Sequence, residues 1–150
     1  MSEALKIGEL AGRLSVPVET IRYYEKEGLL PSPARTAGNY RLYDQNAVER
    51  LTFIRNCRTL GMNLGEVRAL LRAKDQPDIE CGSVNHLIDT HIAQIDERIA
   101  AMLRLKGSLT SLRMHCGSAR VSRDCGILSE LAHCHDPHSP CHANVSGDPL

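Results

Sequence analysis

Residues 81–116 read CGSVNHLIDTHIAQIDERIAAMLRLKGSLTSLRMHC, and this stretch decides how the chain is organised. Its apolar residues recur in steps of three and four, which is the spacing of one face of an α-helix. No proline interrupts residues 82–115, and a helix of that length is about 50 Å long at about 1.5 Å per residue. Cys81 and Cys116 are therefore predicted to lie at opposite ends of a rod. The apolar face comprises Val84, Ile88, Ile92, Ile95, Ile99, Met102, Leu105, Leu109 and Leu112.

A rod of that length predicts a homodimer. Cys81 and Cys116 of one chain are too far apart to share a disulfide or a metal ion. If two copies pack antiparallel, Cys81 of one chain arrives beside Cys116 and Cys125 of the other. Three thiolates then converge twice in each dimer, and thiolates are ligands for soft metal ions. Cys81 precedes the helix, where the helix dipole favours the thiolate form.

The composition predicts a cytoplasmic protein with no membrane partner. Residues 1–20 lack the apolar segment of a signal peptide, and no run of about 18 apolar residues is present. In a reducing compartment the six cysteines are predicted to be metal ligands or reactive thiols before they are disulfides.

The net charge of zero conceals an asymmetry along the chain. Residues 1–75 carry 12 Lys and Arg against nine Asp and Glu, a balance of +3, and the other half carries six against nine, a balance of −3. A mildly basic half suits a polyanionic partner, although an ordinary solvated surface has the same composition.

Residues 1–75 have the pattern of a mainly α, winged helix-turn-helix DNA-binding domain. A short amphipathic helix is predicted over residues 5–14, and a second over 18–27, begun by Pro17 and ended by Gly28. Residues 39–43 alternate like a short strand or hairpin. A third helix is predicted from Asp44, its N-cap, to about residue 60, with Cys57 in the core. A capping box at residues 63–66 opens a fourth helix over 64–72.

The outer face of the second helix and the hairpin carry the candidate DNA contacts. Their side chains can donate hydrogen bonds to phosphate, and phosphate contacts outnumber base contacts in such interfaces. Tyr24 fits either the core or the DNA side. The expected contacts are Thr20, Arg22, Tyr23, Lys26, Arg35, Asn39, Tyr40 and Arg41.

Behind this domain the chain divides into four further parts. Residues 76–81 are a linker, residues 82–115 the dimerisation helix, and residues 116–132 a metal-binding loop with a short helix. Residues 133–150 are rich in His, Cys and Pro, and are predicted to be a disordered tail.

Several ordered motifs together resemble the MerR family of bacterial transcription regulators. They are residues 7–11 (IGELA), 19–25 (ETIRYYE), 28–31 (GLLP) and 35–43, and the similarity extends over about residues 5–132. Residues 53–60 and 81–85 look most like the lead- and cadmium-responsive branch, and residues 125–128 (CGIL) resemble its lead-type members.

The resemblance implies a mechanism. Such regulators form dimers through an antiparallel coiled coil and bind a near-palindromic operator inside an overlong promoter spacer. Without metal they hold the promoter in an unproductive shape. With metal they underwind and kink the DNA, so that RNA polymerase engages both promoter elements and metal-resistance genes are expressed. Relatives that sense monovalent copper or silver carry Ser where this chain has Cys81, so the resemblance implies a divalent ion.

The predicted ligands are Cys81 of one chain with Cys116 and Cys125 of the other. Three thiolates suit Pb(II), and they also suit trigonal Hg(II), whose regulators have similar cysteine spacing. Zinc generally takes four ligands. His115, Cys134 or a water molecule would supply the fourth, so Zn(II) and Cd(II) stay open.

A second candidate metal site combines the long helix with the tail. The resemblance to cadmium-type relatives implies such an arrangement, and the alternatives are a half-exposed helix histidine and a tail that binds metal loosely or not at all. The residues concerned are His91, His133, Cys134, His135, His138, Cys141 and His142.

Other functions fit the sequence less well. A metal-sequestering protein that uses the His/Cys tail would have no need of a helix-turn-helix. An iron–sulfur sensor needs four closely clustered cysteines, and those of this chain are dispersed. No pattern of an enzyme active site stands out.

Overall fold

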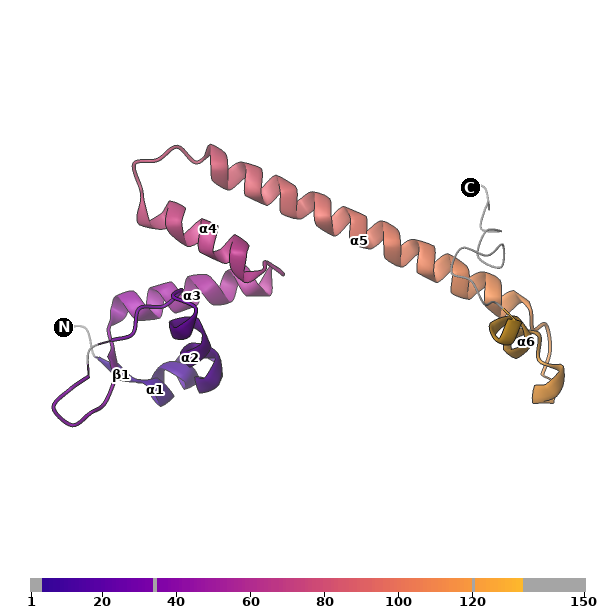
Figure 1. Ribbon diagram of the computed structural model, residues 1–150, viewed down its shortest axis with the longest axis horizontal. Helices are drawn as coiled ribbons and strands as arrows, with labels where there is room; N and C mark the ends of the chain where they lie inside the picture. The colour runs from indigo at the N-terminus through magenta and orange to yellow at the C-terminus, as the bar shows by residue number, and fades with distance from the viewer. Residues whose placement is uncertain (1–3, 34, 120, 134–150) are drawn as a thin grey trace. The chain divides into compact units, whose positions relative to one another are not determined.

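The computed structural model describes residues 4–33, 35–119 and 121–133 (Figure 1). The chain divides into two compact units, Met1–Asp89 and Thr90–Leu150. The first unit therefore continues past the boundary expected at residue 75, because Val84, Leu87 and Ile88 at the start of the long helix pack against its core.

The first unit begins with a strand and two helices. Strand β1 (Leu5–Lys6) leads directly into α1 (Ile7–Leu14), and α2 (Val18–Lys26) follows Pro17. The prediction that α1 starts at residue 5 was wrong, because Leu5 pairs with Tyr43 of strand β2 (Leu42–Tyr43) in an antiparallel sheet. The end of α2 agrees with the sequence, since Gly28 has a φ of 72° that suits glycine.

Residues 35–41 form a hairpin that we call the wing. Arg35 and Arg41 form an antiparallel bridge, and the Thr36 amide donates to the Tyr40 carbonyl at 2.9 Å. Asn39 takes a φ of 64° at the turn, a conformation that asparagine tolerates better than most residues. The predicted strand over 39–43 is thus divided, with its first part in the wing and its last part paired with β1.

Helices α3 (Gln45–Thr59) and α4 (Leu64–Asp75) complete the domain. Their predicted caps are confirmed. Asp44 accepts from the Ala47 amide at 2.9 Å, and Asn63 and Glu66 bond to each other's backbone amides at 3.0 and 2.8 Å. Helix α4 continues three residues beyond the predicted end, since residues 64–76 contain no proline and basic residues in its last turn suit the helix dipole.

The core of the first unit lies among these helices and strand β2. Tyr24 faces into it, and Cys57 is buried as predicted, which raises the pKa of its thiol. Leu60, the C-cap residue of α3, is exposed. Burying each large apolar side chain contributes about 1.5–3 kcal/mol. The fully buried residues are Leu10, Ile21, Leu29, Leu30, Tyr43, Leu51, Ile54, Val67 and Leu71.

Helix α5 (Gly82–Met114) is one uninterrupted helix of 33 residues, as predicted (Figure 1). Beyond its first turns the predicted face remains open to solvent, with exposed fractions from 38% at Ile95 to 64% at Met102. The 3-10 helix η1 (Ser122–Asp124) and helix α6 (Gly126–His133) follow. Among the described residues, none of the helices has the length and apolarity needed to cross a bilayer. We call the exposed residues the α5 stripe: Ile92, Ile95, Ile99, Met102, Leu105 and Leu109.

Candidate nucleic-acid interface and metal centre

Helix α2 directs several of its polar side chains outward. Arg22, Tyr23 and Lys26 are exposed and Thr20 is half-buried, while Ile21 is buried on the opposite side. This division follows from the helical period, which puts the apolar residues of α2 on the core side. The predicted contact residues of α2 are therefore accessible to a partner.

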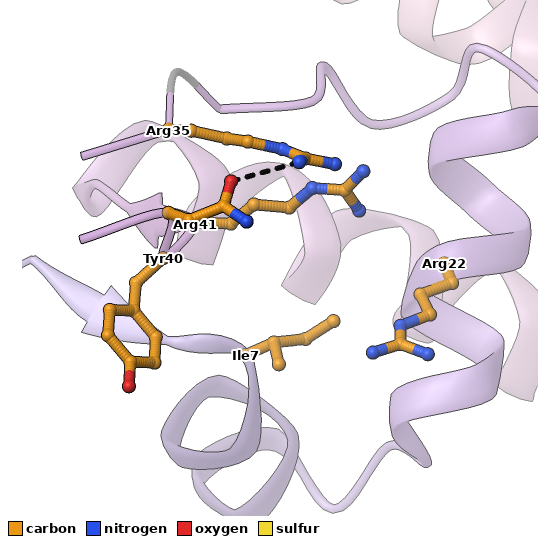
Figure 2. A pocket seen from close by; sticks show the side chains of 6 residues that line it. Ile7, Arg22, Arg35, Tyr40 and Arg41 are labelled. Carbon is orange, nitrogen blue, oxygen red and sulfur yellow. Dashed lines mark hydrogen bonds between the residues drawn. The ribbon is translucent and has the colours of Figure 1, made fainter. Parts of the chain in front are cut away.

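A shallow recess of about 500 Å³ lies where α2 and the wing meet (Figure 2). Figure 2 shows the Arg35 and Arg41 side chains reaching from the wing and Arg22 reaching from α2 toward the same space. Within the wing, Arg35 Nη1 donates to Asn39 Oδ1 at 3.0 Å. Three guanidinium groups around one recess suit an anionic ligand such as a phosphate backbone. We call this the DNA-facing recess, lined by Ile7, Arg22, Arg35, Asn39, Tyr40 and Arg41.

Tyr40 has a contact that the sequence did not indicate. The Lys6 ammonium lies 5.2 Å from the centre of its ring, a cation–π distance. Lys6 immediately precedes α1, so this contact connects the wing with the start of the domain.

Arg41 is paired with an acidic residue that sequence reasoning missed. Its Nη1 donates to Glu25 Oε2 at 2.8 Å, and the Tyr43 hydroxyl donates to Glu25 Oε1 at 2.5 Å. Burial and the Glu25 carboxylate raise the pKa of Tyr43 well above its usual range, so its hydroxyl stays protonated and donates. The only sequence signal was an acid among the basic residues of α2.

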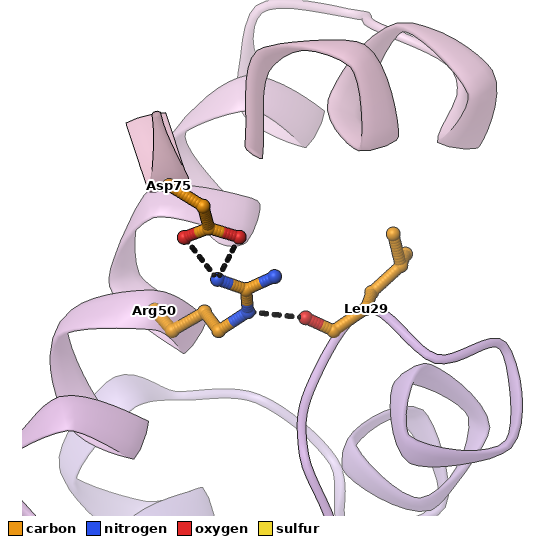
Figure 3. Close-up of polar contacts among 3 residues, drawn as sticks. All are labelled: Leu29, Arg50 and Asp75. Carbon is orange, nitrogen blue, oxygen red and sulfur yellow. Dashed lines mark hydrogen bonds and ion pairs between the residues drawn. The ribbon is translucent and has the colours of Figure 1, made fainter. Parts of the chain in front are cut away.

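Arginines from α3 and α4 hold the end of α2 in place. Arg50 Nε donates to the Leu29 carbonyl at 2.6 Å, and its Nη1 contacts both Asp75 carboxylate oxygens at 2.9 and 3.0 Å (Figure 3). Arg68 donates to the Glu27 carbonyl at 3.0 Å. The Glu27 carbonyl, at the C-cap of α2, lacks a partner within the helix, and Arg68 satisfies it, while Arg50 binds the chain just beyond the helix end.

In the second unit the structure brings two cysteine side chains together. Cys116 follows α5 and Cys125 precedes α6, and the Cys116 side chain lies near enough to Cys125 to contribute to lowering the pKa of the Cys125 thiol. The backbone amide of Leu128 is the largest cause that lowers the pKa of Cys125; burial opposes it, and the Ile127 amide and the Cys116 thiol lower the pKa further. A thiol at a helix N-terminus is thereby disposed to ionise, as a metal ligand must.

Gly126 makes this approach possible. A Cβ atom there would overlap the carbonyl oxygen of His115, so only glycine lets α6 begin against the end of α5. Cys116 is held from the other side, because its carbonyl accepts from Arg113 Nη1 at 2.6 Å and its thiol donates to the Ser118 carbonyl at 3.3 Å. The thiols of Cys116 and Cys125, on a loop held by these hydrogen bonds, are suitable ligands for a soft cation.

Cys81 immediately precedes α5 and is exposed. Its carbonyl accepts from the Asn85 amide at 3.0 Å, which makes it the residue at which the helix begins. In the part of a single chain that the structure describes, no three His, Cys, Asp or Glu side chains gather closely enough to hold a metal ion. The three-cysteine site thus stays a prediction.

Comparison with known proteins identifies the family. Residues 5–74 match the family model of the MerR HTH family regulatory protein, and residues 48–112 match that of the MerR DNA-binding region. An HTH-type transcriptional regulator described as a ZntR homolog in Haemophilus influenzae is 42% identical over 109 residues, which cover 73% of this chain and 81% of that protein.

The chain belongs to the MerR family. The expectation of a transcription regulator rather than an enzyme is thereby confirmed.

The descriptions of two further relatives refer to different metals. The mercuric resistance operon regulatory protein of Bacillus cereus is 36% identical over 126 residues, covering 84% of this chain and 96% of that one. The crystal structure of the transcription regulator PbrR691 from Ralstonia metallidurans, in complex with lead(II), is 50% identical and has a TM-score of 0.77. It covers 85% of this chain and 98% of its own.

The second candidate site of this MerR-family chain is only partly described. The alternative that His91 is a half-exposed helix histidine is wrong, because its exposed fraction is 5%. His133 Nδ1 lies 2.6 Å from the Ser129 carbonyl oxygen, and His115 Nδ1 lies 3.0 Å from that of Ser111. The other residues of the candidate site lie outside the described part of the chain, namely Cys134, His135, His138, Cys141 and His142.

Proposed function

We propose that this protein is a metal-dependent transcriptional activator that binds promoter DNA as a homodimer, represses without metal, and induces metal-resistance genes when Pb(II) binds. The observation that carries the proposal is the pair of thiols at Cys116 and Cys125, in a chain 50% identical to a regulator solved with lead(II). A regulator of this kind works where the DNA and RNA polymerase are, which we expect to be the cytoplasm.

The ligands are Cys81 of one chain with Cys116 and Cys125 of the partner subunit. Thiolates favour soft cations, and three of them without a fixed fourth ligand suit Pb(II) better than Zn(II), which generally takes four. Cd(II) and Zn(II) follow if His115 or a water molecule completes the site. Hg(II) is the other candidate, supported by the 36% identity to the mercuric regulator.

The switch works through the position of Cys81. This residue lies beyond α4 and in front of α5, at the edge of the DNA-binding unit. Connecting it to the loop of the partner chain fixes the angle between the two DNA-binding units, and hence the shape imposed on the promoter. To move the dimer from almost entirely the repressing state to almost entirely the activating state, the metal ion must bind the activating state more tightly by about 5 kcal/mol.

Mixed dimers test whether the site is shared between chains. One chain carries Cys81→Ser and the other carries Cys116→Ser with Cys125→Ser. Neither variant alone has a complete site. In the mixed dimer, Cys81 of the second chain meets Cys116 and Cys125 of the first. We expect half the lead bound by the wild-type dimer, measured by metal analysis and lead–thiolate absorption in reducing buffer.

The outcomes separate the alternatives. Lead binding to the mixed dimer but to neither variant homodimer supports the shared site. Full lead-dependent transcription by the Cys81→Ser homodimer would contradict the site assignment. Competitive titration with Pb(II), Cd(II), Zn(II) and Hg(II) then ranks the ions, and tighter binding of Hg(II) with induction by Hg(II) alone would replace lead as the inducer.

A further inference from the structure

Glu25 is a buried acid beside a basic surface. It lies in the last turn of α2, and its side chain is only 5% exposed. Removing a carboxylate from water costs free energy unless charged and polar partners stabilise it. Its partners therefore indicate its role.

Both carboxylate oxygens of Glu25 bind residues at the base of the wing. Oε2 accepts from Arg41 at 2.8 Å, and Oε1 accepts from the Tyr43 hydroxyl at 2.5 Å. Hydrogen bonds to an ionised acceptor are stronger than those between neutral groups. One side chain of α2 thus fixes the point at which the wing joins the domain.

This link determines where the other arginines of the DNA-facing recess lie. Arg41 forms the bridge with Arg35 across the wing, so holding Arg41 also holds Arg35. Arg22 and Glu25 are both on α2, one helical turn apart. The guanidinium groups of Arg22 and Arg35 line the same recess (Figure 2), and their spacing therefore depends on the contact between Glu25 and Arg41.

We propose that Glu25 is the positioning residue of the DNA interface. It makes no DNA contact, and it holds the wing at the angle to α2 at which Arg22 and Arg35 reach the same DNA backbone. Arg41 acts mainly by connecting the wing to α2, because the Glu25 carboxylate neutralises its charge. This inference rests on the proposed DNA-binding function.

The variant Glu25→Gln tests the proposal, because the two explanations predict changes of DNA affinity in opposite directions. It removes a negative charge near the DNA, so electrostatics alone predicts tighter binding. Loss of positioning predicts binding weaker by about 10- to 100-fold, the loss expected when a charge-assisted hydrogen bond is removed. Affinity is measured by fluorescence anisotropy on a duplex selected from random sequences by the wild-type protein. Circular dichroism and thermal unfolding establish that each variant is folded at the assay temperature.

Glu19→Gln is the matched control, because Glu19 is an exposed acid in the first turn of the same helix. We expect its affinity to be unchanged or higher. If Glu25→Gln binds as tightly as Glu19→Gln, the inference is overturned.

A charge-neutral double variant, Glu25→Gln with Arg41→Gln, covers the case in which Glu25→Gln alone does not fold. It keeps the net charge and leaves no unpaired buried ion. Wild-type affinity of this folded variant overturns positioning. If the wild-type protein selects no duplex, the proposed function itself fails; if it selects one and every variant binds equally, only the role of Glu25 fails.

Discussion

Gly126 shows how much depends on a missing side chain. Gly126 is the first residue of α6 and directly follows Cys125. A Cβ atom at this position would overlap the backbone of His115. The sequence motif containing Cys125 resembled that of lead-type regulators, but the reason for its glycine appears only when α6 is seen against the end of α5.

We expect Gly126→Ala to lower lead affinity by at least about 10-fold, because α6 and Cys125 must move away from Cys116 to relieve the overlap. Promoter binding without metal should be unchanged, since the substitution is in the other unit. Isothermal titration with lead and an anisotropy assay measure the two effects.

Gly117→Ala is the control for this prediction. It lies beside Cys116, and a Cβ atom there would meet nothing within 4 Å. Equal lead affinity in the two alanine variants would show that the approach of α6 to α5 does not position the thiols.

Single residues also mark the limit of prediction from sequence. The caps at Asp44 and Asn63 were predictable, because a cap depends on neighbours three residues away. The pairing of Leu5 with Tyr43 and the burial of His91 were not. Such features depend on contacts between residues far apart in the sequence, and the local sequence pattern does not predict these contacts.

At the scale of elements, α2 is held at its C-terminal end by side chains from two other helices. Arg50 of α3 binds the Leu29 carbonyl, and Arg68 of α4 binds the Glu27 carbonyl. The order and approximate limits of α2, α3 and α4 followed from capping and helix-breaking residues, whereas these partners did not, because an arginine has no sequence signal for the carbonyl it will bind. The candidate DNA contacts stay a prediction, and the pairing of Arg41 with Glu25 had no sequence signal that identified it.

We expect Arg50→Gln to lower the free energy of unfolding by about 1–3 kcal/mol, the range for a hydrogen bond from a charged group. Most of the loss comes from the Leu29 carbonyl, since Asp75 is 51% exposed and its ion pair is screened by solvent. Urea denaturation measures the change. Exposed Arg72 on α4 is the matched position, and Arg72→Gln should stay within about 0.5 kcal/mol of wild type. A similar stability for both variants would mean that the Arg50 contacts are energetically neutral.

At the scale of the whole molecule, the α5 stripe is the feature that requires a second chain. Apolar side chains at helical spacing along so much of one element are seldom left in water. An antiparallel partner would cover them and would also bring the cysteines at opposite ends of the helix together. Dimerisation and metal binding are then two consequences of one surface.

We expect Leu105→Glu to convert the dimer to a monomer and to abolish lead binding in the same step, because a buried charge opposes the helix packing and the shared site loses its second chain. Light scattering after size exclusion measures the mass, and metal analysis measures the lead. Gln94→Glu, on the exposed side of α5, should leave both unchanged. A Leu105→Glu monomer that still bound lead with full affinity would contradict the site between chains.

The arginines that bind carbonyls change how a mutational scan of this protein should be interpreted. Arg50, Arg55, Arg58 and Arg68 each donate to a backbone carbonyl within the first unit. Replacing any of them would reduce promoter occupancy in a cell by lowering the amount of folded protein, with a loss that grows with temperature. A screen scored only by reporter output would assign these positions to DNA recognition, and the part of the arginine footprint that they make up would report protein abundance.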